Sequence, residues 1–75
     1  MIFHTFVLGD VEDPDIYAAQ PIWEWQQTEK GRWVMEHGQD LTYSIHPDIQ
    51  HFGYKVTITG ILNSDDAIYY TLKYQ

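Results

Sequence analysis

The sequence contains no cysteine, and only four lysine and arginine residues stand against eleven aspartates and glutamates. Without cysteine the chain forms neither disulfides nor thiolate metal sites, and a reducing compartment is the expected location. The scarcity of basic residues argues against direct binding to nucleic acid or to an anionic membrane, because phosphate contacts require clustered lysine and arginine. The net charge of −7 instead favours a protein partner, either a basic protein or one that itself binds nucleic acid.

Long apolar runs are also missing, and none approaches the ~20 residues that cross a bilayer. The first ten residues have no basic segment and no small-residue cleavage site, so we expect no signal peptide and a cytoplasmic location. The length predicts a single domain over residues 1–75. Aromatic residues are abundant by contrast, with three Trp, six Tyr and three Phe, and these rings supply the apolar area for a small core.

The N-terminal third contains a strand signal followed by a helix signal. Residues 2–8 are β-branched and aromatic, which predicts a strand. Asp13 suits the cap position of a helix and Pro14 suits its first position. Residues 16–19 then predict a short helical turn, which we expect Pro21 to interrupt.

Residues 21–38 allow two interpretations. In the preferred one they form a helix that starts at Pro21 and stops at Gly38. Glu29 then lies within a stripe of tryptophans, and Gly31 costs about 1 kcal/mol relative to alanine. The alternative is a hairpin with its turn at residues 28–31, which is opposed by a like-charge pair of glutamates across the strands.

The C-terminal half alternates apolar and polar residues over 41–46, 54–62 and 67–74, and each segment predicts a strand. Residues 63–66 have turn chemistry, so we expect the last two strands to pair as an antiparallel hairpin. The predicted fold class is α+β in the order β-α-β-β-β, a small antiparallel sheet with one face covered by the Trp-rich helical segment. The residues expected on the covered side are Val56, Ile58, Tyr70 and Leu72, beneath Trp25 and Trp33.

The opposite sheet face is predicted to be rich in hydroxyl groups and mildly basic, while most carboxylates lie on the helical layer and loops. The alternative function that this face would serve is self-association, for example as a homodimer or a larger structural homo-oligomer. Its candidate residues are Thr57, Thr59, Tyr69 and Thr71. Lys55 and Lys73 supply the basic character of the same face.

Groups that could carry chemistry do not form a recognisable catalytic or metal-binding pattern. His46 and His51 flank Asp48, but this spacing is not a recurrent ligand pattern. Burial of Glu29 between Trp25 and Trp33 would raise its pKa. We favour instead a structural Glu29 that hydrogen-bonds to a tyrosine hydroxyl, a backbone N–H or Lys30. We expect no catalytic residue, cofactor or metal, and therefore a non-enzymatic protein.

The preferred function is binding to another protein and modulating it, for example as an inhibitor. We expect all three tryptophans to lie in the core or under loops, but on a helix they cannot all reach one core, so the alternative is that one is exposed. An exposed tryptophan surrounded by acids is typical of a protein-binding hot spot. A sharper version is mimicry of nucleic-acid charge by spaced carboxylates. The candidate partner-binding residues are Asp13, Asp15, Trp23, Glu24, Glu29 and Glu36.

Residues 13–29, together with Gly31, 33–37 and 52–54, resemble short accessory proteins encoded by tailed bacteriophages. The resemblance covers about the middle two-thirds of the chain and includes no motif with a known role. It implies a protein that acts in the cytoplasm of a bacterial host and binds a host or phage protein there. A virion-associated structural component is the alternative, and the resemblance assigns no catalytic residue.

Overall fold

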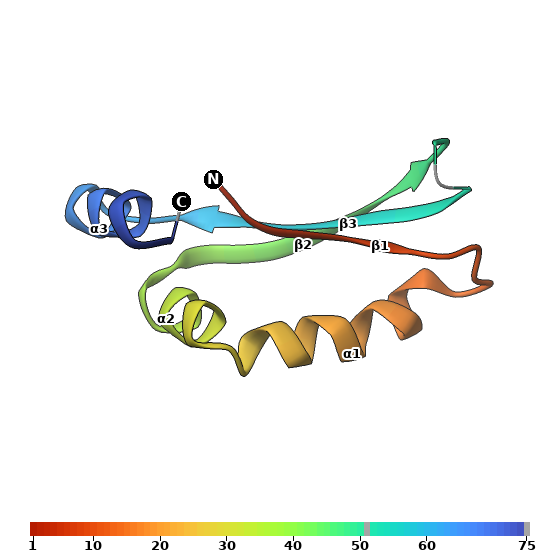
Figure 1. The fold of residues 1–75 in the computed structure, drawn as a ribbon, viewed down its shortest axis with the longest axis horizontal. Coiled ribbons are helices and arrows are strands. Elements are labelled where there is room, and N and C mark those ends of the chain that lie inside the picture. Colours follow the sequence, from red (N-terminus) through yellow and green to blue (C-terminus); the bar gives the residue numbers. More distant parts are fainter. Residues whose placement is uncertain (51, 75) are drawn as a thin grey trace.

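The computed structural model describes residues 1–50 and 52–74, which form a three-stranded antiparallel sheet and three helices (Figure 1). In chain order the elements are β1 (Ile2–Leu8), α1 (Pro14–Gln26), α2 (Glu29–His37), β2 (Gln39–Asp48), β3 (Gly53–Ile61) and α3 (Ser64–Tyr74). The α+β class is confirmed, and so are the three strands predicted within residues 2–62.

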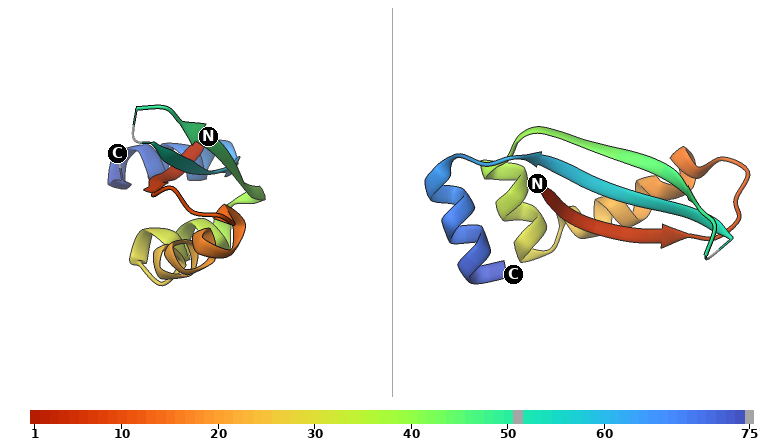
Figure 2. Two further views of the ribbon diagram at one scale, coloured as in Figure 1. Left: turned by 90° about the vertical axis from the view of Figure 1, so that its right-hand side faces the viewer. Right: turned by 90° about the horizontal axis from the view of Figure 1, so that it is seen from above.

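The sheet has the order β1-β3-β2, so β3 is central and the other two strands are its edges. Helices α1 and α2 lie along one face, and α3 lies at one end of the sheet beside α2 (Figures 1 and 2). The molecule is elongated, with extents of 40 × 22 × 20 Å. Within the described residues, no helix combines the length and apolar character needed to cross a membrane.

Helix α1 starts where the sequence predicts, but it does not stop at Pro21. Asp13 occupies the N-cap position, although its side chain makes no capping hydrogen bond, and Pro14 lies in the first turn. The helix then continues through Pro21 to Gln26. Proline removes one backbone donor, and packing of the inward stripe against the sheet offsets that loss. This stripe comprises the buried Ala18 and Trp25 and the half-buried Ile22.

The helical interpretation of residues 21–38 is confirmed and the hairpin is wrong, but the segment contains a break. Thr28 separates α1 from α2, and its hydroxyl accepts a hydrogen bond from the Gly31 N–H at 3.0 Å. The same hydroxyl donates to the Trp25 carbonyl at 2.6 Å. The residues predicted as a hairpin turn therefore cap a new helix, which changes the direction of the chain.

The strand predicted over residues 67–74 is wrong, because this segment is helix α3. The Asn63 side chain accepts a hydrogen bond from the Asp66 N–H at 2.9 Å, as a helix N-cap does. The Asn63 carbonyl accepts from the Ala67 N–H at 2.8 Å, which begins the helical pattern. Turn chemistry at residues 63–66 thus starts a helix, and the hairpin of the open sheet is formed by β2 and β3 instead.

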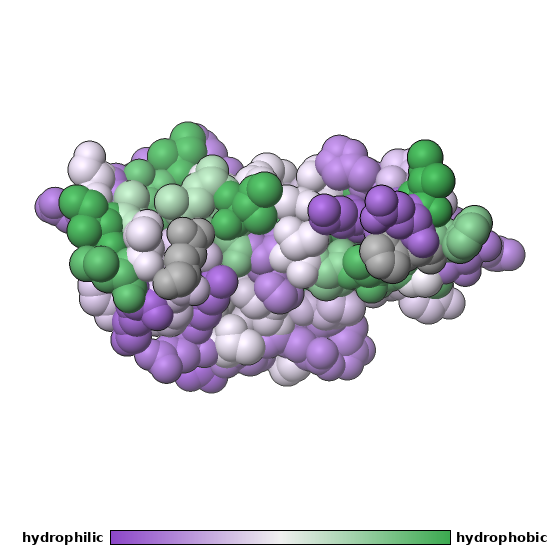
Figure 3. Space-filling model, turned by 45° about the horizontal axis from the view of Figure 1, so that its top comes forward, coloured by the Kyte–Doolittle hydropathy of each residue, from purple (hydrophilic) through white to green (hydrophobic). Residues whose placement is uncertain are grey.

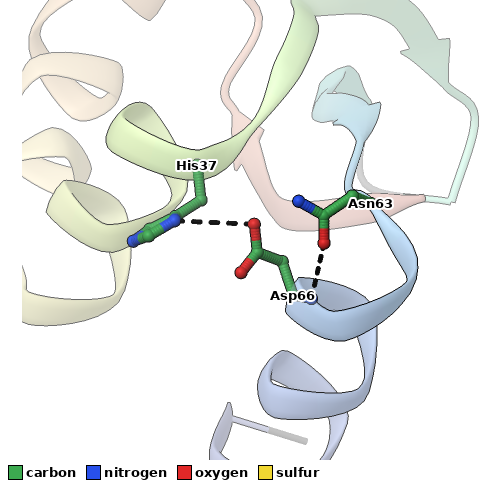
Figure 4. A network of polar contacts seen from close by, with 3 residues as sticks. All are labelled: His37, Asn63 and Asp66. Atoms are coloured by element: carbon green, nitrogen blue, oxygen red, sulfur yellow. Dashed lines mark hydrogen bonds and ion pairs between the residues drawn. The ribbon is translucent and has the colours of Figure 1, made fainter.

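Helices α2 and α3 are joined near Asn63 by a polar contact (Figure 4). His37 at the end of α2 lies with its Nδ1 3.5 Å from a carboxylate oxygen of Asp66 in the first turn of α3. The Trp33 ring stacks on His37 and on Tyr69 at centroid distances of 4.5 and 5.3 Å. An aromatic cluster thereby fixes α3 to α2.

The core consists of two neighbouring clusters between the helices and the sheet. The larger contains Phe3, Trp25, Val34, Ile58 and Tyr70, and Trp33 packs against it. The smaller contains Leu8, Ala18 and Val56. The predicted cover of the sheet by tryptophans is confirmed, but Leu72, predicted to face the core, is 81% exposed.

Candidate interaction surface

The outer face of α1 exposes large apolar side chains. Ile16, Tyr17 and Trp23 are 68%, 58% and 60% exposed. Ile16 and Trp23 are seven residues apart, so two helical turns place them on the same side, away from the sheet. A helix that is apolar on both its inner and its outer face has more apolar surface than folding requires. The surface formed by Ile16, Tyr17 and Trp23, which we term the Trp23 surface, therefore has the character of a binding site.

The chain segment that carries the Trp23 surface contains acids and no basic residue. Residues 9–27 contain no lysine or arginine. Glu24, next to Trp23, is exposed and accepts a hydrogen bond from the Gln20 amide at 3.2 Å. The acids of this segment are Asp10, Glu12, Asp13, Asp15 and Glu24. An apolar centre with an acidic rim matches a partner that presents an apolar hollow with basic residues around it.

The six predicted partner-binding residues divide between two surfaces. Asp13, Trp23 and Glu24 belong to α1 or its cap, and Asp15 at the start of α1 accepts a hydrogen bond from the Tyr43 hydroxyl at 3.5 Å. Glu29 and Glu36 lie on α2, where they line a hollow with Arg32, Trp33, Lys73 and Tyr74.

Basic groups offset the charge of the α2 acids. The Lys73 ammonium lies 3.1 Å from a Glu29 carboxylate oxygen. Hydrogen bonds to Tyr69 and Glu29 raise the pKa of Lys73, which stays charged. Glu29 is exposed, so the alternative in which tryptophans bury it is wrong, and its basic partner is Lys73 instead of the expected Lys30. Of the six candidate residues, Glu29 is therefore the acid with an ion pair to a basic residue among the described contacts.

Helix α3 carries an exposed apolar face that the sequence did not predict. Ile68 and Leu72 are 61% and 81% exposed, and they line a shallow hollow with Ala67 and Thr71. Figure 3 shows apolar side chains gathered at the end of the molecule that carries α3. A strand pattern places Ile68 and Leu72 on the same side as Tyr70, whereas a helix turns them away from it. Helical periodicity over residues 64–74 is therefore the sequence signal that places Ile68 and Leu72 on a different side from Tyr70.

The open sheet face differs from the predicted oligomer face. Thr57 and Thr59 of β3 lie on it beside Ser44 and Thr42 of β2, their partners in the register. Tyr69, Thr71 and Lys73, predicted on this face, lie on α3 instead. The hydroxyl-rich face is therefore smaller than predicted, and Lys55 is the predicted base that remains on it.

The histidines do not assemble with acids into a metal site among residues 1–50 and 52–74, where no group of three possible ligands is found. His46 contacts the Ser44 hydroxyl at 3.1 Å on the sheet. His51, the other half of the predicted pair, lies outside the described residues. His4 stacks on Trp25, with ring centroids 5.5 Å apart.

A small apolar cavity of about 120 Å³ lies between α1, α2 and β2. Its lining includes Trp25, Met35 and Ile58. The lining contains no carboxylate, histidine or lysine, so it offers no acid–base pair for catalysis. Its size suits a single apolar side chain.

His4 gives the folded protein a predicted sensitivity to acid. Burial, and secondarily the charge of Lys30, lower the pKa of His4 below its ordinary value of 6.5. The fold thus favours neutral His4, so its contribution to stability is complete above about pH 6.5 and falls as the pH drops toward the folded-state pKa. We expect urea denaturation to show a larger loss of stability below about pH 6.5 in the natural protein than in His4→Gln. Equal losses would contradict this role, since the other titrating groups are common to both proteins.

Comparisons with protein-family models, with curated proteins and with solved structures find no match to this chain.

Proposed function

We propose that this protein is a non-enzymatic accessory protein that binds a basic partner protein through the Trp23 surface and modulates it. The observation that carries the proposal is the 60% exposure of Trp23 on the outer face of α1. An exposed tryptophan beside Ile16 and Tyr17 is available to fill an apolar hollow on a partner. The surrounding acids then steer a basic partner and fix its orientation.

The resemblance to bacteriophage accessory proteins supports a setting in the cytoplasm of a bacterial host. The partner is then a host protein or a phage protein, and a nucleic-acid-binding protein has the required basic surface. Binding of a basic protein through the Trp23 surface has more support than mimicry of nucleic-acid charge. Mimicry needs a row of uncompensated carboxylates, but Glu29 pairs with Lys73 and Glu36 shares a hollow with Arg32.

Trp23→Ser is expected to abolish partner binding without unfolding the protein. A hot-spot tryptophan contributes about 2 kcal/mol or more, which is roughly a 30-fold change in affinity. An exposed side chain contributes little to the folded state, so the free energy of unfolding should change by less than about 0.5 kcal/mol. The measurement is affinity capture from a bacterial lysate by the immobilised protein, with mass spectrometry to identify what is retained.

Leu72→Ser is the matched control, because Leu72 is an exposed apolar residue on a different helix. It should retain the partner that Trp23→Ser loses. Glu24→Lys should weaken capture, and higher salt should weaken it further, because both act on the acidic rim. Loss of the partner with Leu72→Ser, and not with Trp23→Ser, would contradict the proposal and transfer binding to α3.

A further inference from the structure

The two edges of the sheet differ in how their ends are protected, although the central residues of both, 42–46 of β2 and 4–8 of β1, contain no proline and no Asp, Glu, Lys or Arg. An edge strand presents unpaired backbone groups that can pair with another strand, unless a bulge, a proline or a charge interrupts it. The β2 edge has such interruptions at both ends. Asp40 adopts a left-handed conformation with φ of 51°, where the register shifts between Gln39 and Thr42, and Pro47 and Asp48 end the strand.

The β1 edge has no such interruption between His4 and Leu8. The strand Ile2–Leu8 contains no charged residue, no proline and no glycine, and its register shift lies between Ile2 and His4. No described element pairs with its outer side, because β1 ends the strand order. Thr5 is exposed, and Val7 is 47% exposed. An uncharged edge is a notable feature in a chain of net charge −7.

The hydrogen-bond pattern identifies which backbone groups of β1 face outward. Met1 and Gly60 exchange both backbone hydrogen bonds, at 2.9 and 3.1 Å. Such pairs recur at every second residue of an antiparallel ladder, so the next residues of β3 bonded to β1 are Ile58, Val56 and Tyr54. Their partners in the register are His4, Phe6 and Leu8. The backbone groups of Thr5 and Val7 therefore point away from the sheet.

The position of Pro47 supports this assignment independently. The same alternation gives the residues of β3 that bond to β2 as Lys55, Thr57 and Thr59. Pro47 is opposite Tyr54, which does not belong to that set. Its missing N–H thus falls on the outer side of β2, where proline is tolerated.

We propose that β1 pairs antiparallel with β1 of a second copy of this chain, so that two three-stranded sheets join into one sheet of six strands. The two-fold axis passes beside Phe6. Thr5 of each copy then lies opposite Val7 of the other, and the outward backbone groups of both residues are paired. Other two-fold registers bring the irregular segment around Ile2, or residues beyond Leu8, into the pairing.

A second copy suits this edge because a two-fold contact must be complementary to itself. On the helix-covered side Phe6 meets Phe6 and His4 meets Leu8, and on the open side Thr5 meets Val7. No like charges face each other across the axis. The remainder of each copy is acidic, so salt should strengthen this association by screening the repulsion. Binding of a basic partner to the Trp23 surface should show the opposite dependence on salt.

The test is the molar mass of the full chain, measured by light scattering over a range of protein and salt concentrations. We expect the mass to rise toward twice that of one chain as protein concentration rises, and to do so more readily at high salt. Val7→Pro should weaken the association about tenfold or more, because each copy loses an outward donor while the ladder to β3 is kept. Tyr43→Pro is the matched control, since Tyr43 is 45% exposed on the other edge, and it should leave the association unchanged.

A second readout uses the absence of cysteine from the natural sequence. Under a mild oxidant such as diamide, Phe6→Cys should form a disulfide-linked dimer on a non-reducing gel, whereas Tyr43→Cys should remain a single chain. Circular dichroism establishes that each variant is folded. A monomer under all conditions would overturn the proposal, as would association that survives in folded Val7→Pro, or no linkage in Phe6→Cys.

Discussion

Gly31→Ala is expected to leave most of the protein unfolded at 25 °C, although Gly31 lies inside a helix. Helix propensity alone predicts the opposite, a gain of about 1 kcal/mol. A Cβ atom at this position, however, would lie 1.8 Å from the Trp25 carbonyl oxygen and 2.7 Å from its carbonyl carbon. Gly31 is buried where α2 crosses the end of α1, and both obstacles are backbone atoms that no rotamer change can move.

The expected loss is at or above the upper end of the ~1–3 kcal/mol typical of overpacked cores. Chains of this size rarely have more than about 3–5 kcal/mol of stability, so the loss is comparable to the whole. Urea denaturation followed by tryptophan fluorescence measures it. Gly9→Ala is the matched control, because a Cβ there meets nothing within 4 Å, and it should be nearly neutral. If Gly31→Ala proved as stable as the natural protein, the close crossing of α1 and α2 would be wrong.

Tyr70→Ala is expected to be the most damaging truncation in α3, with a loss of about 3–5 kcal/mol. Tyr70 is only 1% exposed, and its ring packs edge-on against Phe3 at a centroid distance of 5.4 Å. Its hydroxyl donates a hydrogen bond to the Phe3 carbonyl at 3.3 Å. Tyr70→Phe keeps the ring and loses this bond, so it should cost about 1 kcal/mol.

Leu72→Ala is the control that distinguishes a helix from a strand in this segment. A strand places Tyr70 and Leu72 on the same side, so both truncations would then be damaging. A helix separates them by about 200°, and Leu72→Ala should change the free energy of unfolding by less than about 0.5 kcal/mol. Urea denaturation of the three variants measures these differences. A large loss with Leu72→Ala would contradict the helical assignment of residues 64–74.

The error over residues 67–74 has a definite physical origin. Tyr70 and Tyr74 are four residues apart, and this spacing puts them on one side of a strand and also on one side of a helix. Residues 68–71 are all β-branched or aromatic and favour a strand. The helix forms because the Asn63 cap and the acidic first turn start it, and because Trp33 offers an aromatic surface to both tyrosines. That surface belongs to α2 and is absent from the local sequence.

The candidate site was predicted in part. The helix start at Asp13 followed from local signals. The exposure of Trp23 did not, because the sequence favoured a covered position for all three tryptophans. Local signals did not show which acids pair with a basic residue and which do not. Whether Glu29 is free or paired depends on Lys73, which is distant in the sequence and reaches Glu29 only because α3 lies against α2.

The amino-acid sequence by itself determined the acidic charge, the absence of cysteine, the α+β class and the three strands of the sheet. These properties depend on composition and on short-range alternation, which a single segment carries within itself. Only the tertiary structure decided that residues 64–74 are a helix, that Thr28 divides the tryptophan-bearing segment, and that β1 and β2 are the edges. The helix over residues 64–74 and the strand order depend on contacts between distant segments, whose free energies outweigh local strand preference, whereas the break at Thr28 comes from its own capping contacts to Trp25 and Gly31.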